Sequence, residues 1–272
     1  MIALSRQTNR QFSILIVSAL GGTPRKVYDS GQEPYRDVIG EPSYVSWSRE
    51  GKQLALSVMS HDVGARAIAF LTLADSSLHF VTKPPPGYSD WSPVISPDGR
   101  SLVFRRTAGP GFVDDLYVMP TQGGEPHRVT SDHVYIANAP AWTPDSKEVI
   151  FTSDRGGMNT LWRVSISGGF SGDEPRRIEG VGTGTFAPAV ALKGNRLAYT
   201  QGIANSNLWS VTLADKTHLR SNPRQLMFSK GQVGLPAFSP DGARIVVESS
   251  RSGYNKSGWR IATAPNPRNL HF

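Results

Sequence analysis

The feature that most constrains the fold of this chain is a strand–turn–strand unit that recurs along it. Residues 95–104 read ISPDGRSLVF, in which proline presets the turn, aspartate can accept backbone N–H bonds, and glycine can adopt a positive φ. The β-branched and aromatic residues that follow are typical of a buried strand. Residues 142–151 (WTPDSKEVIF) and 238–247 (FSPDGARIVV) repeat the unit, and weaker copies occur at 47–56 and 191–199.

The turns of these five copies are evenly spaced along the chain. They are centred on Gly51, Gly99, Ser146, Asn195 and Gly242, which lie 47 to 49 residues apart. A period near fifty, with several short strands per repeat, is typical of a β-propeller, where each repeat forms one four-stranded blade. We therefore predict an all-β, six-bladed β-propeller of four-stranded antiparallel blades in a single domain over residues 1–272. The predicted blades cover about 1–40, 43–82, 91–130, 140–178, 188–227 and 236–270.

The first twenty residues have two interpretations. The apolar run at 12–17, followed by small residues, is similar to a secretory signal, but in the repeat register it matches the third strand of other blades. We favour the strand, so this sequence shows no signal peptide. Residues 2–5 then match a second strand, which leaves the first blade incomplete at the N-terminus. Either the chain is a fragment of a longer protein or its start was assigned too late, and we favour the fragment.

Composition narrows the classes of function. The chain has no cysteine, which excludes disulfides, thiolate catalysis and Cys-ligated metal centres. Its net charge of +7 comes from scattered Lys and Arg residues, so we predict a solvated basic surface and no direct contact with nucleic acid. The six histidines lack metal-binding spacing, and no nucleophile elbow or phosphate-binding loop is present. We predict no catalytic residue, no metal and no cofactor.

The loops differ by position in the repeat, and this difference predicts a binding face. First-to-second-strand connections are tight turns, whereas second-to-third-strand connections are long and irregular, at 60–66, 105–114, 153–159, 201–206 and 249–257. In an up-and-down blade these long loops and the inter-blade connections emerge on one face. Variable loops on a rigid scaffold are where binding residues usually lie. We therefore predict that this face binds the partner.

Arginine recurs on the predicted binding face, often beside Asp or Ser. The candidate binding residues are Arg105, Arg106, Asp154, Arg155 and Arg251. One hypothesis is a ring of guanidinium groups near the mouth of a central channel, suited to carboxylate or phosphate partners. The other hypothesis, which we favour, is that the Asp and Ser side chains form turns and the arginines tie adjacent blades together.

The repeat resembles the TolB-type, WD-repeat-like propeller repeat of bacteria. The resemblance rests on the SPDGRxLVF hairpin, the third strands DLYV and TLWRV, and the connection GGxPxxV, and its most typical stretch is 153–162 (SDRGGMNTLW). It covers nearly the whole chain and weakens at 48–51 (SREG) and 192–195 (LKGN), where the proline–aspartate turn is missing. These departures leave the predicted fold intact.

The resemblance also implies a style of function. Such propellers mostly serve as protein-binding platforms, as the periplasmic component of an envelope complex or as sensor and scaffold regions. We therefore expect a monomeric, non-enzymatic module for a protein or peptide partner, periplasmic and without membrane insertion. The alternative is the substrate-gating propeller of a prolyl-oligopeptidase-like serine peptidase whose catalytic domain lies outside this sequence. No catalytic residue carries over, because the repeat motif holds turn and core positions only.

Overall fold

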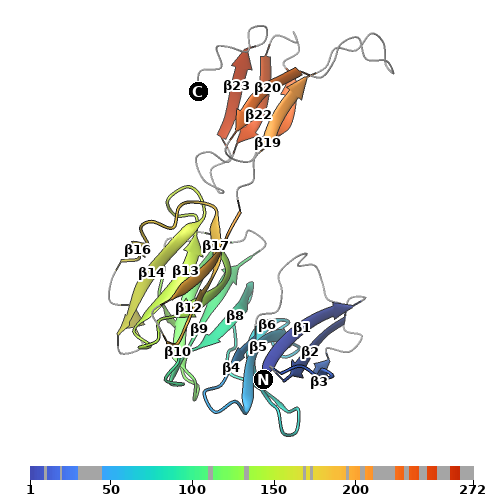
Figure 1. Ribbon diagram of the computed structural model, residues 1–272, viewed down its shortest axis with the longest axis vertical. Coiled ribbons are helices and arrows are strands. Elements are labelled where there is room, and N and C mark those ends of the chain that lie inside the picture. The colour runs from blue at the N-terminus through green and yellow to red at the C-terminus, as the bar shows by residue number, and fades with distance from the viewer. Residues whose placement is uncertain are drawn as a thin grey trace.

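The computed structural model describes residues 1–8, 11–18, 20–29, 45–109, 113–131, 135–167, 170–171, 174–193, 196–202, 206–210, 224–229, 233–238, 244–249 and 258–263. Every regular element in these ranges is a β-strand, and consecutive strands pair antiparallel in sheets that follow chain order (Figure 1). The all-β prediction is therefore confirmed.

Four sheets make up the first two thirds of the chain. The first contains β1 (Ile2–Thr8), β2 (Gln11–Val17) and β3 (Arg25–Asp29). The second contains β4 (Val45–Trp47), β5 (Gln53–Ser60), β6 (Ala65–Thr72) and β7 (Leu78–Phe80). The third contains β8 (Tyr88–Ile95), β9 (Ser101–Ala108), β10 (Val113–Pro120) and β11 (His127–Arg128). The fourth contains β12 (Ile136–Trp142), β13 (Glu148–Ser153), β14 (Thr160–Ser167), β15 (Phe170–Ser171) and β16 (Arg176–Arg177).

Three smaller sheets follow. They are β17 (Thr185–Val190) with β18 (Leu197–Gln201), β19 (Ser206–Ser210) with β20 (Arg224–Ser229), and β21 (Val233–Phe238) with β22 (Arg244–Ser249) and β23 (Gly258–Thr263). The predicted fifth blade would join β18 to β19, but the two strands belong to separate sheets. In Figure 1 the strands β19–β23 stand apart from the earlier sheets. The structure thus shows four-stranded antiparallel sheets that resemble propeller blades, and it does not show a closed ring.

The recurring turns at Gly51, Gly99 and Ser146 have the predicted positive φ, and those at Asn195 and Gly242 lie outside the described residues. Gly99 has φ +77°, and its N–H donates to the carbonyl of Ser96 at 2.8 Å. Asp98 accepts from the N–H of Arg100 at 3.0 Å, as the sequence predicts. Consecutive turns also touch, because Nη1 of Arg49 donates to the carbonyl of Asp98 at 3.2 Å. The N–H of Asp98 in turn donates to Oγ of Ser146 in the fourth sheet at 3.1 Å.

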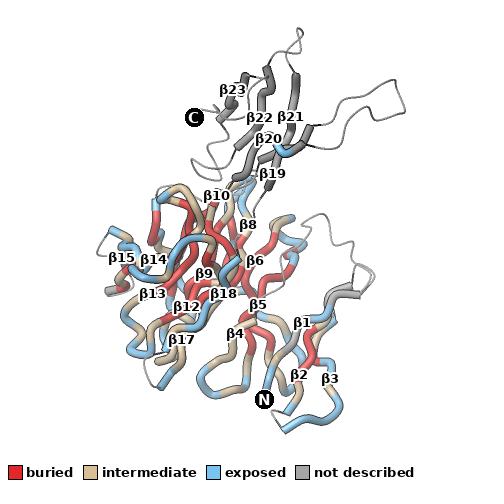
Figure 2. The backbone as a smooth tube through the Cα atoms, turned by 45° about the horizontal axis from the view of Figure 1, so that its top comes forward, coloured by how far each residue is buried: buried red, intermediate tan, exposed pale blue. Residues whose placement is uncertain are grey.

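The hydrophobic core lies between consecutive sheets (Figure 2). One cluster joins the first and second sheets and includes Ile14 and Leu56. A second joins the second and third sheets and includes Ile68 and Phe104, and a third joins the third and fourth sheets and includes Phe151. Sheets packed face to face in chain order are the arrangement expected of propeller blades. The apolar run at 12–17 is confirmed as a strand, β2, with Ile14 fully buried.

The innermost strands β8, β12 and β17 each carry a bulge at a corresponding place. The strand pairing shifts between Trp91 and Val94 in β8, and corresponding shifts occur in β12 and β17. One non-glycine residue in each bulge is left-handed: Ser92 at φ +51°, Asn138 at +62° and Ala187 at +52°. Bulges of this kind redirect the strand and the side chains beside it. In the part of the chain that the structure describes, no helix is long and apolar enough to cross a membrane.

A joint is defined here as the contact between one sheet and the innermost strand of the next. The β8 joint connects β5 and β6 to β8, the β12 joint connects β9 and β10 to β12, and the β17 joint connects β13 and β14 to β17. Hydrogen bonds cross each joint, for example from Oγ of Ser57 to the carbonyl of Asp90 at 2.6 Å in the β8 joint.

Candidate binding face at the second-to-third-strand loops

Charged side chains are buried where the second strands end and the third strands begin. Seven residues in this region are each less than a tenth exposed: Arg66, Asp90, Arg105, Arg106, Asp114, Asp115 and Asp154. A buried charge without a partner is costly, so these residues must be compensated by one another or by the backbone. Their partners therefore show what this end of the sheets is built to do.

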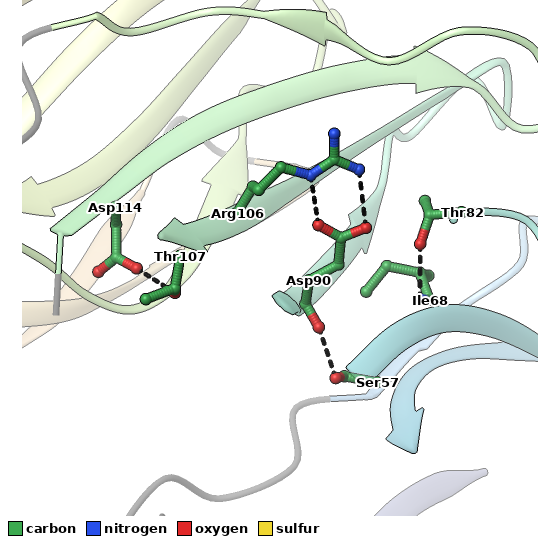
Figure 3. A network of polar contacts seen from close by, with 7 residues as sticks. All are labelled: Ser57, Ile68, Thr82, Asp90, Arg106, Thr107 and Asp114. Atoms are coloured by element: carbon green, nitrogen blue, oxygen red, sulfur yellow. Dashed lines mark hydrogen bonds and ion pairs between the residues drawn. The ribbon is translucent and has the colours of Figure 1, made fainter. Parts of the chain in front are cut away.

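Arg106 and Asp90 form a bidentate ion pair within the third sheet (Figure 3). Nε and Nη2 of Arg106 lie 2.6 and 2.9 Å from the two carboxylate oxygens of Asp90, the residue directly opposite in the strand pairing. The guanidinium also lies 4.8 Å from the ring centre of Tyr117. Burial acts to lower the pKa of Arg106, but hydrogen bonds and charge from Asp90 outweigh it and raise that pKa. Arg106 is thus a permanently charged, fixed group.

Arg105 connects the third sheet to the fourth across the β12 joint. Its Nη1 donates to the carbonyl of Asn138 at 3.4 Å, and its Nη2 lies 3.8 Å from a carboxylate oxygen of Asp114. The other oxygen of Asp114 accepts from the N–H of Ile136 at 3.3 Å, and the carboxylate also accepts a short hydrogen bond from Thr107. The arginine therefore ties adjacent sheets together, as the second sequence hypothesis describes.

Asp154 and Arg155 organise the loop that follows β13. The buried carboxylate of Asp154 accepts from the N–H of Tyr135 at 3.1 Å, and its carbonyl accepts from Gly157 at 2.7 Å. The guanidinium of Arg155 lies 5.1 Å from the ring centre of Trp162. Trp162 is the counterpart of Tyr117 in the repeat, so Arg155 takes the stacking position that Arg106 takes one sheet earlier.

The sequence candidates thus lie at the ends of β9 and β13, in contacts within and between sheets. Arg251 lies outside the described residues. The structure does not gather the described candidates around one ligand, and their direct role in binding stays a prediction. More accessible residues on the same face include Met59 and Tyr88, which are 43% and 39% exposed, and the turn at 61–64.

Sequence reasoning missed four members of this region: Arg66, Asp90, Asp114 and Asp115. Nη1 of Arg66 donates to the carbonyl of Ser57 at 3.0 Å, and its guanidinium lies 4.7 Å from the ring centre of Trp91 across the β8 joint. A sequence signal for Arg66 was present, because this single charged residue interrupts an otherwise apolar strand at 65–71. Within the described ranges, no group of three or more His, Cys, Asp or Glu residues could hold a metal ion.

Comparison with known proteins identifies relatives of two kinds. An uncharacterized peptidase, YuxL, from Bacillus subtilis is 31% identical over 163 residues, which are 58% of this chain and 21% of that protein. The Tol-Pal system protein TolB from Anaeromyxobacter dehalogenans is 28% identical over 179 residues, which are 64% of this chain and 37% of that protein. The chain therefore matches well under half the length of each relative.

A solved structure and a family model agree on the fold. The crystal structure of TolB from Acinetobacter baumannii aligns with a TM-score of 0.56 and 23% identity, over 92% of this chain and 59% of that one. The family model described as the TolB beta propeller domain matches residues 6–226. This match covers most of the chain, and the repeated sheets have the expected pairing. The chain belongs to the TolB β-propeller domain family.

Proposed function

We propose that this chain is a non-catalytic interaction module, a six-bladed propeller that binds a protein or peptide on the face of the second-to-third-strand loops. The observation that carries the proposal is the set of buried ion pairs and stacked arginines beneath that face. Asp90–Arg106 and Arg105–Asp114 fix the strand ends from which the loops leave. Loops on a fixed base lose little conformational entropy on binding, which favours recognition of a partner.

Family membership supports the same proposal. TolB-type propellers resemble this chain across most of its length, and a TolB protein of a Tol-Pal system is among its relatives. We therefore propose a periplasmic location and a protein partner. Because Arg105 and Arg106 are buried and paired, we expect the exposed loop residues to make the direct contacts.

Photo-crosslinking in cells tests which face binds. The photoreactive residue p-benzoylphenylalanine is placed at Asp62 or Tyr88 on the loop face, and at the exposed Lys52 in a tight turn as the matched control. We expect a discrete protein adduct from the two loop positions and none from Lys52. Adducts only from Lys52, or none from either loop position, would contradict the proposed face.

The peptidase relative favours a second candidate function. Because YuxL is named a peptidase and aligns over 58% of this chain, the propeller could belong to a serine peptidase and gate its substrates. A fluorophosphonate probe applied to native cell extract distinguishes the two. Labelling of the polypeptide that contains this sequence would support the gate, and crosslinking of an unlabelled polypeptide at Asp62 would support the interaction module.

A further inference from the structure

The β17 joint contains three buried side-chain oxygen atoms that have no hydrogen-bond partner. They are Oγ1 of Thr152, Oδ1 of Asn159 and Oγ1 of Thr185. Both threonines are fully buried, at 0% exposure. Buried polar atoms in native proteins are nearly always bonded, because leaving one without a partner costs free energy. Three such atoms in one joint therefore point to a bound group.

The repeat places the oxygens of Thr152 and Asn159 close together. In the strand pairing Thr152 lies opposite Leu161, as Arg105 lies opposite Leu116 in the third sheet. Asn159 accordingly corresponds to Asp114. Arg105 and Asp114 are an ion pair with 3.8 Å between Nη2 and Oδ1, so side chains at these two positions point toward one another.

Thr185 lies beside these two residues. Thr152 corresponds to Ser57 and Thr185 to Asp90, and in the β8 joint Oγ of Ser57 donates to the backbone carbonyl of Asp90 at 2.6 Å, so the repeat places Thr152 next to the backbone of Thr185. Within the β17 joint itself, the N–H of Thr185 contacts the carbonyl of Asn159 at 3.3 Å. The three residues that carry these oxygens thus meet at the contact of β13 and β14 with β17.

The other two joints hold a positive charge at this place. Arg66 donates to the carbonyl of Ser57 in the β8 joint, and Arg105 donates to the carbonyl of Asn138 in the β12 joint. The β17 joint has Thr152 and Asn159 at the corresponding positions, and neither carries charge. Oxygen atoms therefore gather here without the cation that the earlier joints supply from their own side chains.

We propose that the β17 joint binds a monovalent metal cation, Na⁺ or K⁺, between Thr152, Asn159 and Thr185. Hard cations prefer oxygen ligands, and the carbonyl of Ala187, the counterpart of the Asn138 carbonyl, is placed to add a fourth. These donors are all uncharged, so they match one positive charge better than two. Full burial of both threonines favours a bare ion over a basic side chain from a partner.

The test is thermal unfolding of the purified protein in NaCl, KCl and choline chloride at equal ionic strength. Choline is too large for a sealed site, and equal ionic strength removes differences in screening. A cation that binds only the folded state raises Tm, by about 3–6 °C when its concentration is tenfold above Kd. We expect a saturable rise in NaCl or KCl relative to choline chloride.

Three variants assign the effect to this site. Thr152→Val keeps the shape and removes one oxygen, so its Tm should become independent of the cation. Thr23→Val makes the same change at an exposed position and should respond as the wild type does. The pair Thr152→Arg with Asn159→Asp copies Arg105 and Asp114, and should remove the cation dependence by supplying the charge internally.

Several results would overturn the proposal. Equal wild-type Tm values in the three salts would mean that ordered water alone occupies the joint. An unchanged cation response in Thr152→Val would place the effect elsewhere, and stabilisation by Ca²⁺ but not by Na⁺ or K⁺ would exclude a monovalent site. The wild-type comparison decides the question even if a variant fails to fold, and it is independent of which partner the propeller binds.

Discussion

In the third sheet Asp90 of β8 and Arg106 of β9 form a buried ion pair, whereas Thr185 of β17 and Gln201 of β18 occupy the corresponding positions. Nε2 of Gln201 donates instead to the carbonyl of Thr183 at 3.2 Å. The β17 joint is held by contacts to the backbone, such as the 2.7 Å hydrogen bond from Gly184 to the carbonyl of Asn159. The backbone repeat thus forms the same strand pair in both places, and the side chains decide how strongly each innermost strand is fixed.

The second strands of these two regions, β9 and β18, also differ in how deeply their side chains are buried. Phe104 in β9 is fully buried between two sheets, but its counterpart in β18, Tyr199, is 39% exposed. The third sheet has a neighbour on both faces, whereas β18 pairs only with β17 in the described chain. Stability should therefore be distributed unevenly, with the second to fourth sheets as the most stable part.

The largest expected effect comes from removing the two aromatic side chains at this shared position. Phe104→Ala should lower the free energy of unfolding by about 3–5 kcal/mol, because it opens a cavity in a closed core. Tyr199→Ala should cost less than about 1 kcal/mol, since much of its ring already contacts solvent. Urea denaturation measures both, and equal losses would show that β18 is as tightly packed as β9.

The ion pair between β8 and β9 should be the next most sensitive feature. Asp90→Ala leaves the guanidinium of Arg106 buried without its carboxylate, and should cost about 3 kcal/mol. The double variant Asp90→Thr with Arg106→Gln copies the β17–β18 pair and should cost less, because no charge is left uncompensated. A double variant no more stable than Asp90→Ala would show that the aromatic contact of Arg106, and not its charge pairing, stabilises the third sheet.

A smaller effect is expected where the turns of neighbouring sheets meet. Gly51 and Gly99 both have positive φ, so alanine at either position should cost about 1–2 kcal/mol. A Cβ on Gly99 would lie 3.2 Å from Cβ of Arg49, whereas a Cβ on Gly51 would meet nothing within 4 Å. Gly99→Ala should therefore be the more destabilised of the two in urea unfolding. The reverse order would mean that the side chain of Arg49 moves away from the added Cβ at little cost in free energy.

The smallest expected effect is a dependence on pH. Hydrogen bonds from the hydroxyls of Ser96 and Thr143 lower the pKa values of Asp98 and Asp145 in the folded protein. Their contribution to stability is present above the unfolded pKa of about 4 and is lost as the pH falls through the lower folded values.

Both carboxylates are largely solvated, so each should contribute well under about 1 kcal/mol. Unfolding of the wild type between pH 5 and pH 2 should therefore be slightly more pH-dependent than unfolding of the variant with both Asp98→Asn and Asp145→Asn. The turn at 191–196 has no such aspartate, so it should lack this pH-dependent stabilisation. Identical pH profiles for wild type and variant would show that Asp98 and Asp145 do not stabilise their turns in this way.

The sequence was sufficient to predict the strands, the tight turns and the order of the sheets, because each depends on local residue preferences that recur. It was not sufficient for the side-chain pairs. Counting outward from the turn at Gly99 places Trp91 opposite Arg106, but the bulge at Ser92 shifts the register by one residue and brings Asp90 there instead. A serine before a proline carries no clear signal for a left-handed bulge. The prediction of six blades also extends beyond what the described sheets show.

The binding candidates illustrate the same division. The sequence correctly placed Asp154 and Arg155 in the loop after β13, but it placed Arg105 and Arg106 in a loop at 105–114, whereas both lie within β9, which extends to Ala108. Their partners are contributed by other strands and other sheets, as Asn138 is for Arg105, and such contacts depend on three-dimensional packing. Exposed positions such as Met59 and Tyr88 lacked any distinctive motif and were found only in the structure.

The contacts between successive turns have an evolutionary consequence. Arg49 contacts the turn of Asp98, and Asp98 contacts Ser146. The turn of Asp98 therefore contacts the preceding turn through one set of atoms and the following turn through another. Such head-to-tail contacts are open-ended, unlike a self-complementary two-fold interface. A tandem duplication of one 47–49-residue segment would therefore produce a new sheet with both contact surfaces already formed. Proteins of this type can change their number of repeats in a single genetic event, and divergence of the joints can follow later.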